Sequence, residues 1–388
     1  MKLTLIADQL FDGEQLHQQR PLSIEDGYIR ALDTVSGATE VRLKGLLAPG
    51  FIDCQVNGGG GLLFNQAPTV TTLQHMVQTH ARYGTTSMLP TIISSHYEVA
   101  LQGATAISQA LSSGMPGIIG IHFEGPHLND VKRGIHNLSV LRPAADHELA
   151  LYRRKDLGTV LITVAPENFT AEQISVLVKQ QVLVSLGHSN ATAAQTQAAL
   201  DAGATGFTHL FNAMSPLTSR EPGMTGIALT DLESWCGLIA DGHHVHPMCA
   251  KLALQLKPRG KMLLVTDAMW TPDAPQQEFR FEDHTIFMHN KRLQSSSGQL
   301  AGAAISMLDA VNYTISVLGI DTLEALRMAS LYPSQFLGRS AEIGQLKPGY
   351  RADLVQLTSS SDGTLTLHNT WLRGRSLFPT QETSYEQN

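Results

Sequence analysis

The sequence of 388 residues predicts an α/β fold, a distorted (β/α)8 barrel of the TIM type with a small β-sandwich domain attached. Three observations support this prediction. Apolar, strand-like runs alternate with helical patterns through the middle of the chain, short β patterns occupy both ends, and polar residues follow several of the apolar runs. Such barrels are usually about 250 residues long, so the chain is long enough for a barrel and an appendage.

The two ends of the chain consist of short β patterns separated by turns, with Asp12-Gly13 and Asp26-Gly27 as turn signals near the N-terminus. Neither end has enough strands to be stable alone. We therefore expect residues 1–48 and 342–388 to form one small β-sandwich domain, with the catalytic barrel, residues 49–341, inserted between them. Two separate hairpins at the edge of the barrel are the alternative.

The middle of the chain contains eight apolar runs that we interpret as barrel strands. Several intervening helices should end near a glycine, which readily closes a helix, namely Gly84, Gly114 and Gly203. An open doubly wound sheet is the alternative fold, but no GxGxxG sequence opens the first βα turn. The glycine run 58–61 is expected to be a flexible loop near the site. The eight runs are LLAPGFIDCQV, TTSMLPTII, GIIGIHFEG, TVLITVAPE, QVLVSLGHS, ATGFTHLFN, CGLIADGHH and KMLLVTDAM.

Composition and charge argue against several classes of protein. Hydrophobic residues make up 43% and charged residues 16%, an ordinary balance for a globular enzyme. The net charge of −7 argues against a nucleic-acid-binding surface. The three cysteines are widely spaced, and no run approaches the roughly 20 apolar residues of a membrane span. We therefore expect a cytoplasmic protein with neither a nucleic acid nor a membrane as partner.

Three potential metal ligands each follow a different predicted strand. They are Glu124 in IHFEG, His188 in SLGHS and His209 in FTHLF. Because the carboxyl ends of barrel strands meet at one face, these side chains can surround a single ion and leave a position for water. We predict one divalent ion per subunit, zinc or alternatively iron(II). A salt-bridged glutamate and ordinary core histidines are the structural alternatives.

Further polar residues suggest acid–base and anion-binding roles. Asp267, at the end of KMLLVTD, could accept a proton from metal-activated water and donate it to a leaving amine, although it could instead cap a helix. His136 lies in a loop soon after Glu124 and could bond a substrate carbonyl. Arg220 and His244 are candidate anion binders, and a surface arginine and a structural histidine are their alternatives.

These motifs resemble the amidohydrolase superfamily, and within it the branch that deacetylates phosphorylated amino sugars. The resemblance extends in order over nearly the whole chain. The stretches that carry it are APGFIDCQVNG, IHFEGPHLN, KRGIHN, VAPE, LGHSNAT, THLFNAM, REPG, IADGHHV, LVTDAM, LYPSQFLG and GQLKPGYRADLV.

The resemblance implies roles for individual residues. Glu124, His188 and His209 match the metal ligands, Asp267 matches the aspartate that serves first as base and then as acid, and His136 matches the histidine that polarises the carbonyl. The resemblance also implies a homodimer whose phosphate site is completed across the interface by Arg220 and His244. The implied substrate contacts are Ile135, His136, Asn212, Ala213, Arg220, Asp241, Gly242, His243, His244, Leu300, Ala301 and Gly302.

Two segments depart from the superfamily pattern. Many amidohydrolases have His-x-His after the first strand and hold two metals, whereas this chain has Gln55-Val56-Asn57. Gln55 and Asn57 would be weak ligands at most, so a single tightly held ion is expected. The segment Ala301 to Ala304 lacks the hydroxyl residues often found there, which leaves its contacts to the sugar open.

The function that the resemblance implies is hydrolysis of N-acetyl-D-glucosamine 6-phosphate to D-glucosamine 6-phosphate and acetate. The same reaction on N-acetyl-D-galactosamine 6-phosphate is the nearest alternative. A different amidohydrolase reaction, such as cyclic-amide hydrolysis or nucleobase deamination, would show no preference for a phosphate. A non-catalytic protein on the same barrel is a further alternative, but such proteins usually lose metal ligands.

Overall fold

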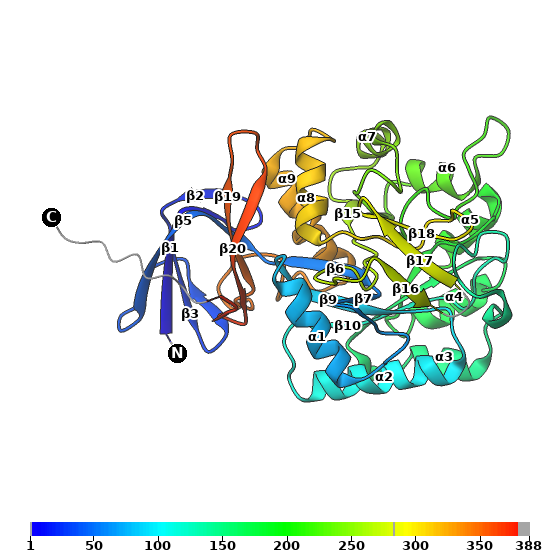
Figure 1. Cartoon of the computed structure of the whole chain (residues 1–388), viewed down its shortest axis with the longest axis horizontal. Helices are drawn as coiled ribbons and strands as arrows, with labels where there is room; N and C mark the ends of the chain where they lie inside the picture. The colour runs from blue at the N-terminus through cyan, green and yellow to red at the C-terminus, as the bar shows by residue number, and fades with distance from the viewer. Residues whose placement is uncertain (1, 282–283, 379–388) are drawn as a thin grey trace.

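The computed structural model describes residues 2–281 and 284–378, and it contains a barrel with a smaller β domain beside it (Figure 1). The N-terminal strands and the last strands of the chain both lie in the smaller domain (Figure 1). Residues 379–388, which we assigned to the terminal domain, lie outside the described residues. The arrangement agrees with a barrel inserted between two terminal segments.

The barrel has the eight parallel strands predicted from the eight apolar runs. Their order is β15-β14-β13-β12-β11-β10-β9-β6, and a parallel bridge between Val56 and Ala268 brings the first and last strands together. The doubly wound alternative is therefore wrong. The strands are β6 (Phe51–Val56), β9 (Thr85–Ile93), β10 (Gly120–Glu124), β11 (Thr159–Val164), β12 (Leu183–Leu186), β13 (Gly206–Phe207), β14 (Trp235–Leu238) and β15 (Met262–Leu264).

Helices surround the barrel (Figure 1). Gly84, Gly114 and Gly203 have positive φ angles and end helices as predicted. No helix in the described part of the chain is long and apolar enough to cross a membrane. The helices are α1 (Val70–Ala81), α2 (Tyr97–Ser112), α3 (Asp146–Tyr152), α4 (Ala171–Val178), α5 (Ala193–Asp201), α6 (Gly223–Thr230), α7 (Pro247–Leu256), α8 (Met307–Ser316), α9 (Thr322–Met328) and α10 (Leu331–Phe336).

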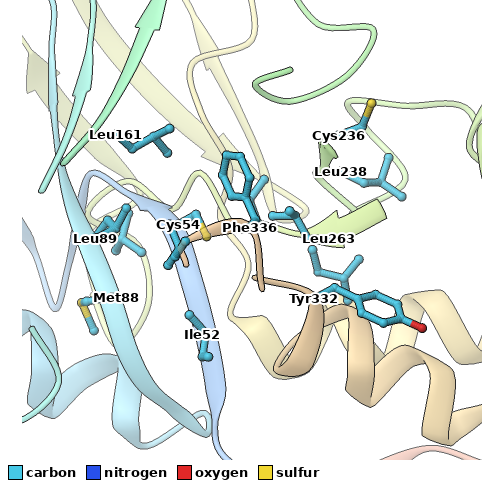
Figure 2. Close-up of a cluster of buried hydrophobic side chains, with 14 of the residues drawn as sticks. Ile52, Cys54, Met88, Leu89, Leu161, Cys236, Leu238, Leu263, Tyr332 and Phe336 are labelled. Atoms are coloured by element: carbon cyan, nitrogen blue, oxygen red, sulfur yellow. The ribbon is translucent and has the colours of Figure 1, made fainter. Parts of the chain in front are cut away.

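Apolar side chains fill the amino-terminal end of the barrel. Phe336 of α10 lies within the cluster of buried side chains that includes Cys54 and Leu263 (Figure 2). The Phe336 ring centroid is 5.7 Å from that of Trp235, the first residue of β14. A Cβ on Gly206, the first residue of β13, would lie 2.9 Å from the same ring. The aromatic side chain of α10 therefore closes this end of the barrel.

The terminal segments form one β domain, as predicted. Strand β5 (Thr39–Pro49) pairs with β19 (Leu354–Ser359), so the alternative of two separate hairpins is wrong. The strands form one continuous sheet, and a bridge between Tyr28 and Arg351 brings its β4 edge back toward the segment before β19. The sheet therefore bends around its own core, to which Leu5 and Trp371 belong. The other strands are β1 (Lys2–Phe11), β2 (Leu16–Gln18), β3 (Pro21–Glu25), β4 (Tyr28–Ala31), β20 (Leu365–Leu372) and β21 (Arg375–Ser376).

The glycine run after β6 is not the flexible loop that we expected. Gly58–Gly59 (β7) pairs with Leu62–Leu63 (β8), and the His80 ring donates from Nε2 to the Gly58 carbonyl at 2.7 Å. A Cβ on Gly60 would lie 2.2 Å from His75 Nε2, so only glycine allows this close approach. The run is a tight hairpin that α1 holds in place.

A three-stranded antiparallel sheet after β15 was not predicted. It consists of β16 (Glu278–Phe281), β17 (His284–His289) and β18 (Arg292–Ser295). Its buried side chains form a small core together with Ile135, which follows β10, and Met269, which follows β15. This sheet therefore packs against the loops at the carboxyl end of the barrel.

Candidate active site

A cavity of about 370 Å³ at the carboxyl ends of the barrel strands gathers most of the predicted site residues. The predicted residues that line it are Asn57, Glu124, Ile135, His136, His188, His209, Asn212, Ala213, His244, Asp267, Leu300 and Gly302. Residues that the sequence did not suggest also line it, namely Ile93, Val131, Lys132, Gly134, Ile239, Met269 and Gln299.

Glu124, His188 and His209 form the centre of the cavity. Glu124 Oε1 lies 3.0 Å from His209 Nε2 and 3.3 Å from His188 Nε2, and the two Nε2 atoms are 3.0 Å apart. All three side chains are buried. Because zinc binds such atoms at about 2 Å, ligands of one ion should lie roughly this far apart. The group therefore fits a single divalent cation.

The backbone and the neighbouring groups orient these ligands. His188 Nδ1 donates to the Lys132 carbonyl at 2.9 Å, which leaves the lone pair of Nε2 facing Glu124. His188 and His209 have φ angles of 47° and 35°. Such values are uncommon outside glycine, and they cluster at functional sites where the surrounding structure holds them.

Glu124 is held as an anion in a buried position. Burial alone would raise the pKa of Glu124, but its close contacts with the rings of His188 and His209 keep that pKa well below its usual value. An ionised carboxylate with two imidazoles is a donor set typical of open catalytic metal sites. The residues present therefore suit a divalent metal chemically as well as geometrically.

Asp267 lies beside this group and is held by two side-chain amides. Its Oδ1 accepts from Asn57 Nδ2 at 2.7 Å and from Gln55 Nε2 at 3.1 Å, and Gln55 Nε2 also donates to Glu124 Oε1 at 2.9 Å. Burial and then the charge of Glu124 raise the pKa of Asp267 to about 6. Asp267 does not cap a helix, because α8 begins later and has Ser306 as its N-cap.

His136 has a defined tautomer. The Ser94 backbone N–H donates to His136 Nδ1 at 3.3 Å, so the hydrogen of the neutral ring is on Nε2. Ser94 Oγ is also 2.7 Å from Nδ1. Burial, and then the nearby His188, lower the pKa of His136 to about 3. His136 is therefore a neutral ring with one N–H available to a substrate.

His244 is oriented by a buried carboxylate. Its Nδ1 donates to Asp241 Oδ2 at 2.7 Å, and Asp241 Oδ1 accepts from the backbone N–H groups of His243 and His244. Burial would raise the pKa of Asp241, but the hydrogen bond from His244 holds it below its usual value. Asp241 is thus a support for His244, which lines the cavity.

Some predicted residues do not line the cavity of a single chain. Arg220 is exposed on the loop before α6, and Ala301 is buried in the small core beneath the β16–β18 sheet. Gly242 and His243 belong to the turn around Asp241, and Gln55 lies behind Asp267 and Glu124. These residues can act on the site only through neighbours or in another arrangement of chains.

Sequence reasoning missed two groups that orient site histidines. Ser94 directly follows the predicted strand TTSMLPTII, the same position as the other site residues, so its place in the pattern could have indicated it. Lys132 holds His188 through its backbone carbonyl. Since every residue has a carbonyl, no sequence signal could have identified this one.

A parallel barrel with a buried Glu-His-His group and a separate aspartate at its carboxyl end has the architecture of a metal-dependent hydrolase. Comparison with known proteins gives the family. A model described as the Amidohydrolase family matches residues 46–377, and the chain belongs to this family. The resemblance found in the sequence is therefore confirmed.

Individual relatives cover nearly the whole chain. It is 42% identical to the N-acetylgalactosamine-6-phosphate deacetylase of Shewanella sp. (strain ANA-3), over 98% of both chains. It is 34% identical to the N-acetylglucosamine-6-phosphate deacetylase of Haemophilus influenzae, over 86% of this chain and 88% of that protein. The crystal structure of N-acetylglucosamine-6-phosphate deacetylase from Pasteurella multocida matches with a TM-score of 0.91 at 32% identity, covering 97% of this chain and 99% of that one.

Proposed function

We propose that the protein hydrolyses the acetamide of N-acetyl-D-glucosamine 6-phosphate to acetate and D-glucosamine 6-phosphate, in amino-sugar catabolism. The observation that carries this proposal is the position of Asp267, a buried carboxylate beside the Glu124–His188–His209 group but outside it. The names of the relatives from Haemophilus influenzae and Pasteurella multocida support the choice of substrate.

Glu124, His188 and His209 would hold one divalent ion per subunit, zinc or alternatively iron(II). Both ions accept a carboxylate with two imidazoles. When bound, the ion polarises the acetamide carbonyl and lowers the pKa of a water molecule. Gln55 and Asn57 turn their amide nitrogens toward Asp267, which supports a single ion because an N–H group cannot be a ligand.

Asp267 would transfer a proton from the attacking water to the acetamide nitrogen. Its Oδ1 accepts two amide hydrogen bonds, whereas Oδ2 has no donor among residues 2–281 and 284–378. The free oxygen can accept a proton from the attacking water and deliver it to the acetamide nitrogen as the C–N bond breaks. A pKa of about 6 suits a group that must both gain and lose a proton near neutral pH.

His136 stabilises charge on the substrate oxygen. The hydrogen on its Nε2 can be donated to the acetamide carbonyl, which becomes negatively charged as water attacks. Because the pKa of His136 is lowered to about 3, the ring stays neutral and does not compete for the proton that Asp267 carries. The two residues therefore have separate roles.

The sugar would contact the remaining cavity wall. Ile135, Asn212 and Ala213 line one part of it, and Leu300 with Gly302 line another. Ala301 would support that second part from the small core behind it. These contacts would fix the pyranose ring so that its acetamide reaches Glu124 and Asp267.

The phosphate site would be completed in a homodimer. His244 lines the cavity, whereas Arg220 is exposed and does not. Near the same surface, α7 exposes an apolar stripe of Met248, Leu252 and Leu256, with exposed fractions of 73%, 49% and 46%. An exposed apolar stripe of this kind is typical of a subunit interface. Such a dimer would let one protomer supply Arg220 to the site of its partner.

Mixing two inactive variants tests this arrangement. In a hybrid dimer of Asp267→Asn and Arg220→Ala, one site would have both an intact Asp267 and an intact Arg220 from the other chain. Random exchange should then restore about a quarter of wild-type activity, because half the dimers are hybrid and half their sites are intact. No recovery after verified exchange would show that Arg220 does not act across the interface.

The same reaction on N-acetyl-D-galactosamine 6-phosphate is the second candidate. It is favoured by the 42% identity to the Shewanella protein named for that substrate. Acetate release from both sugar phosphates, with metal content measured on the same sample, tests the proposal. A higher kcat/KM for the glucosamine epimer and one ion per chain are expected. Absence of acetate release from either sugar by metal-loaded protein would refute it.

We also propose that the protein is cytoplasmic. Its cysteines Cys54, Cys236 and Cys249 are all free, as is usual in a reducing compartment. Fractionation of cells that express the chain would test this location.

A further inference from the structure

Asn57 stands in the cavity wall, with the two ends of its amide in different environments. Its Nδ2 donates to Asp267 Oδ1 at 2.7 Å. Its Oδ1 is buried and has no hydrogen-bond partner in the described part of the chain. The side chain is only 3% exposed, and it lines the same cavity as Asp267 and Glu124. Asn57 therefore brings an acceptor without a donor to the wall of this cavity.

The orientation of this amide follows from its neighbours. An ionised Asp267 has only acceptors, so the NH2 end of Asn57 must face it. Gln55 cannot pair with the other end of Asn57, because its own NH2 group already donates to Asp267 and to Glu124. Rotating the Asn57 amide by half a turn would place an oxygen against a carboxylate. Oδ1 is thus the end left without a donor.

Buried acceptors in folded proteins nearly always have a donor, because an unpaired one is destabilising. The free protein leaves Asn57 Oδ1 without one among its described residues. A ligand with an N–H or O–H group close to Asp267 would satisfy it. Under the proposed function, the group close to Asp267 is the acetamide nitrogen, which carries one hydrogen.

We propose that Asn57 Oδ1 accepts a hydrogen bond from the acetamide nitrogen, while Nδ2 positions Asp267 to protonate that nitrogen. This inference rests on the proposed function. The oxygen of water bonds to the carbonyl carbon, and the electron pair of the broken C–N bond goes to nitrogen. The proton that water gives to Asp267 then passes to the same nitrogen. Asn57 holds the original N–H throughout, so that the lone pair faces Asp267.

Measurements of ligand binding can distinguish the roles of the two ends of the Asn57 amide. D-Glucosamine 6-phosphate has the nitrogen, whereas 2-deoxy-D-glucose 6-phosphate lacks it and is otherwise matched. We expect Asn57→Leu to weaken binding of the amino sugar roughly tenfold, the usual size of one lost hydrogen bond to a charged group. Binding of the deoxy sugar should change less than about twofold. Calorimetric titration of metal-loaded protein measures both.

Gln55→Met is the matched control. Gln55 also donates to Asp267, but it does not line the cavity. This variant should lower kcat and leave the preference for the amino sugar unchanged. Metal content and melting temperature are measured for each variant, and Asn57→Ala replaces Asn57→Leu if the leucine does not fold.

Two outcomes would overturn the inference. One is an Asn57 variant that keeps the wild-type preference for the amino sugar. The other is equal weakening of both ligands, which indicates a general change of the cavity. Failure of the proposed function is distinct, because wild-type protein would then neither release acetate nor prefer the amino sugar. If wild type does both and the Asn57 variants keep the preference, only the role of Asn57 is wrong.

Discussion

The two ends of the barrel are built from the same eight strands, but the side chains buried at one end are apolar and those buried at the other end include charged groups. At the amino end, Phe336 packs against Trp235 and Gly206 within an apolar cluster. At the carboxyl end, Glu124 and Asp267 are both buried and close together. The amino end buries apolar side chains, and removing these from water is favourable. The carboxyl end buries charged groups, which costs free energy unless a ligand compensates the charge.

Backbone conformations show the same contrast. Residues with positive φ angles follow strand ends at the cavity, namely His188, His209, Phe211, Ala213 and Asp267. Such conformations are unfavourable for residues other than glycine, so other contacts must stabilise them. The amino end of the barrel supplies part of that stability through close apolar packing. We therefore expect substitutions at the carboxyl end to affect turnover, and those at the amino end to affect folding.

The largest effect is expected from Asp267→Asn. The variant keeps the shape of the side chain but cannot accept the proton of water, so kcat should fall by about 10³-fold or more. The melting temperature should not fall, because the change removes a buried carboxylate whose pKa is raised by burial and by Glu124. Steady-state kinetics and thermal denaturation measure the two quantities. Near-normal turnover at normal metal content would show that another group moves the proton.

Phe336→Ala should have the opposite effect, a loss of stability with little change in kcat. It removes a buried aromatic ring from the amino end of the barrel, which typically costs about 3–5 kcal/mol of unfolding free energy. The kcat of the folded fraction should change less than about twofold, since the ring is remote from the cavity. Phe336→Leu is the control that restores most of the volume. A large loss of kcat in fully folded Phe336→Ala would mean that the two ends of the barrel are coupled.

The contrast also explains what could be predicted from the sequence. Strands buried on both faces are continuous apolar runs, so all eight were recognisable, and Glu124, His188, His209 and Asp267 stood out because they end such runs. The β16–β18 sheet was not recognisable, since its short, half-exposed strands lack a long apolar run. Its place beside the cavity depends on packing with Met269 and with Ile135, and Ile135 is distant in the sequence.

Contacts made by backbone groups could not be predicted from the sequence either. The carbonyl of Lys132 holds His188, and the N–H of Ser94 sets the tautomer of His136. The direction of the Gln55 and Asn57 amides also depends on the carboxylates that they meet, which only the folded arrangement brings together. Residue types near a site were therefore predictable, whereas their orientations were not.

The smallest effect is expected from Asp241→Asn. This variant should separate phosphate binding from the chemical step, both of which take place at the carboxyl end of the barrel. An amide can still accept from the His244 ring, but a neutral amide holds that ring less firmly than the buried Asp241 carboxylate does. Binding of a phosphate should weaken, with KM for the sugar phosphate rising about fivefold and kcat nearly unchanged. Unphosphorylated N-acetyl-D-glucosamine is the control substrate, and its kcat/KM should not change. If both substrates lose kcat/KM equally, Asp241 supports the cavity as a whole, and the division between phosphate binding and chemistry is wrong.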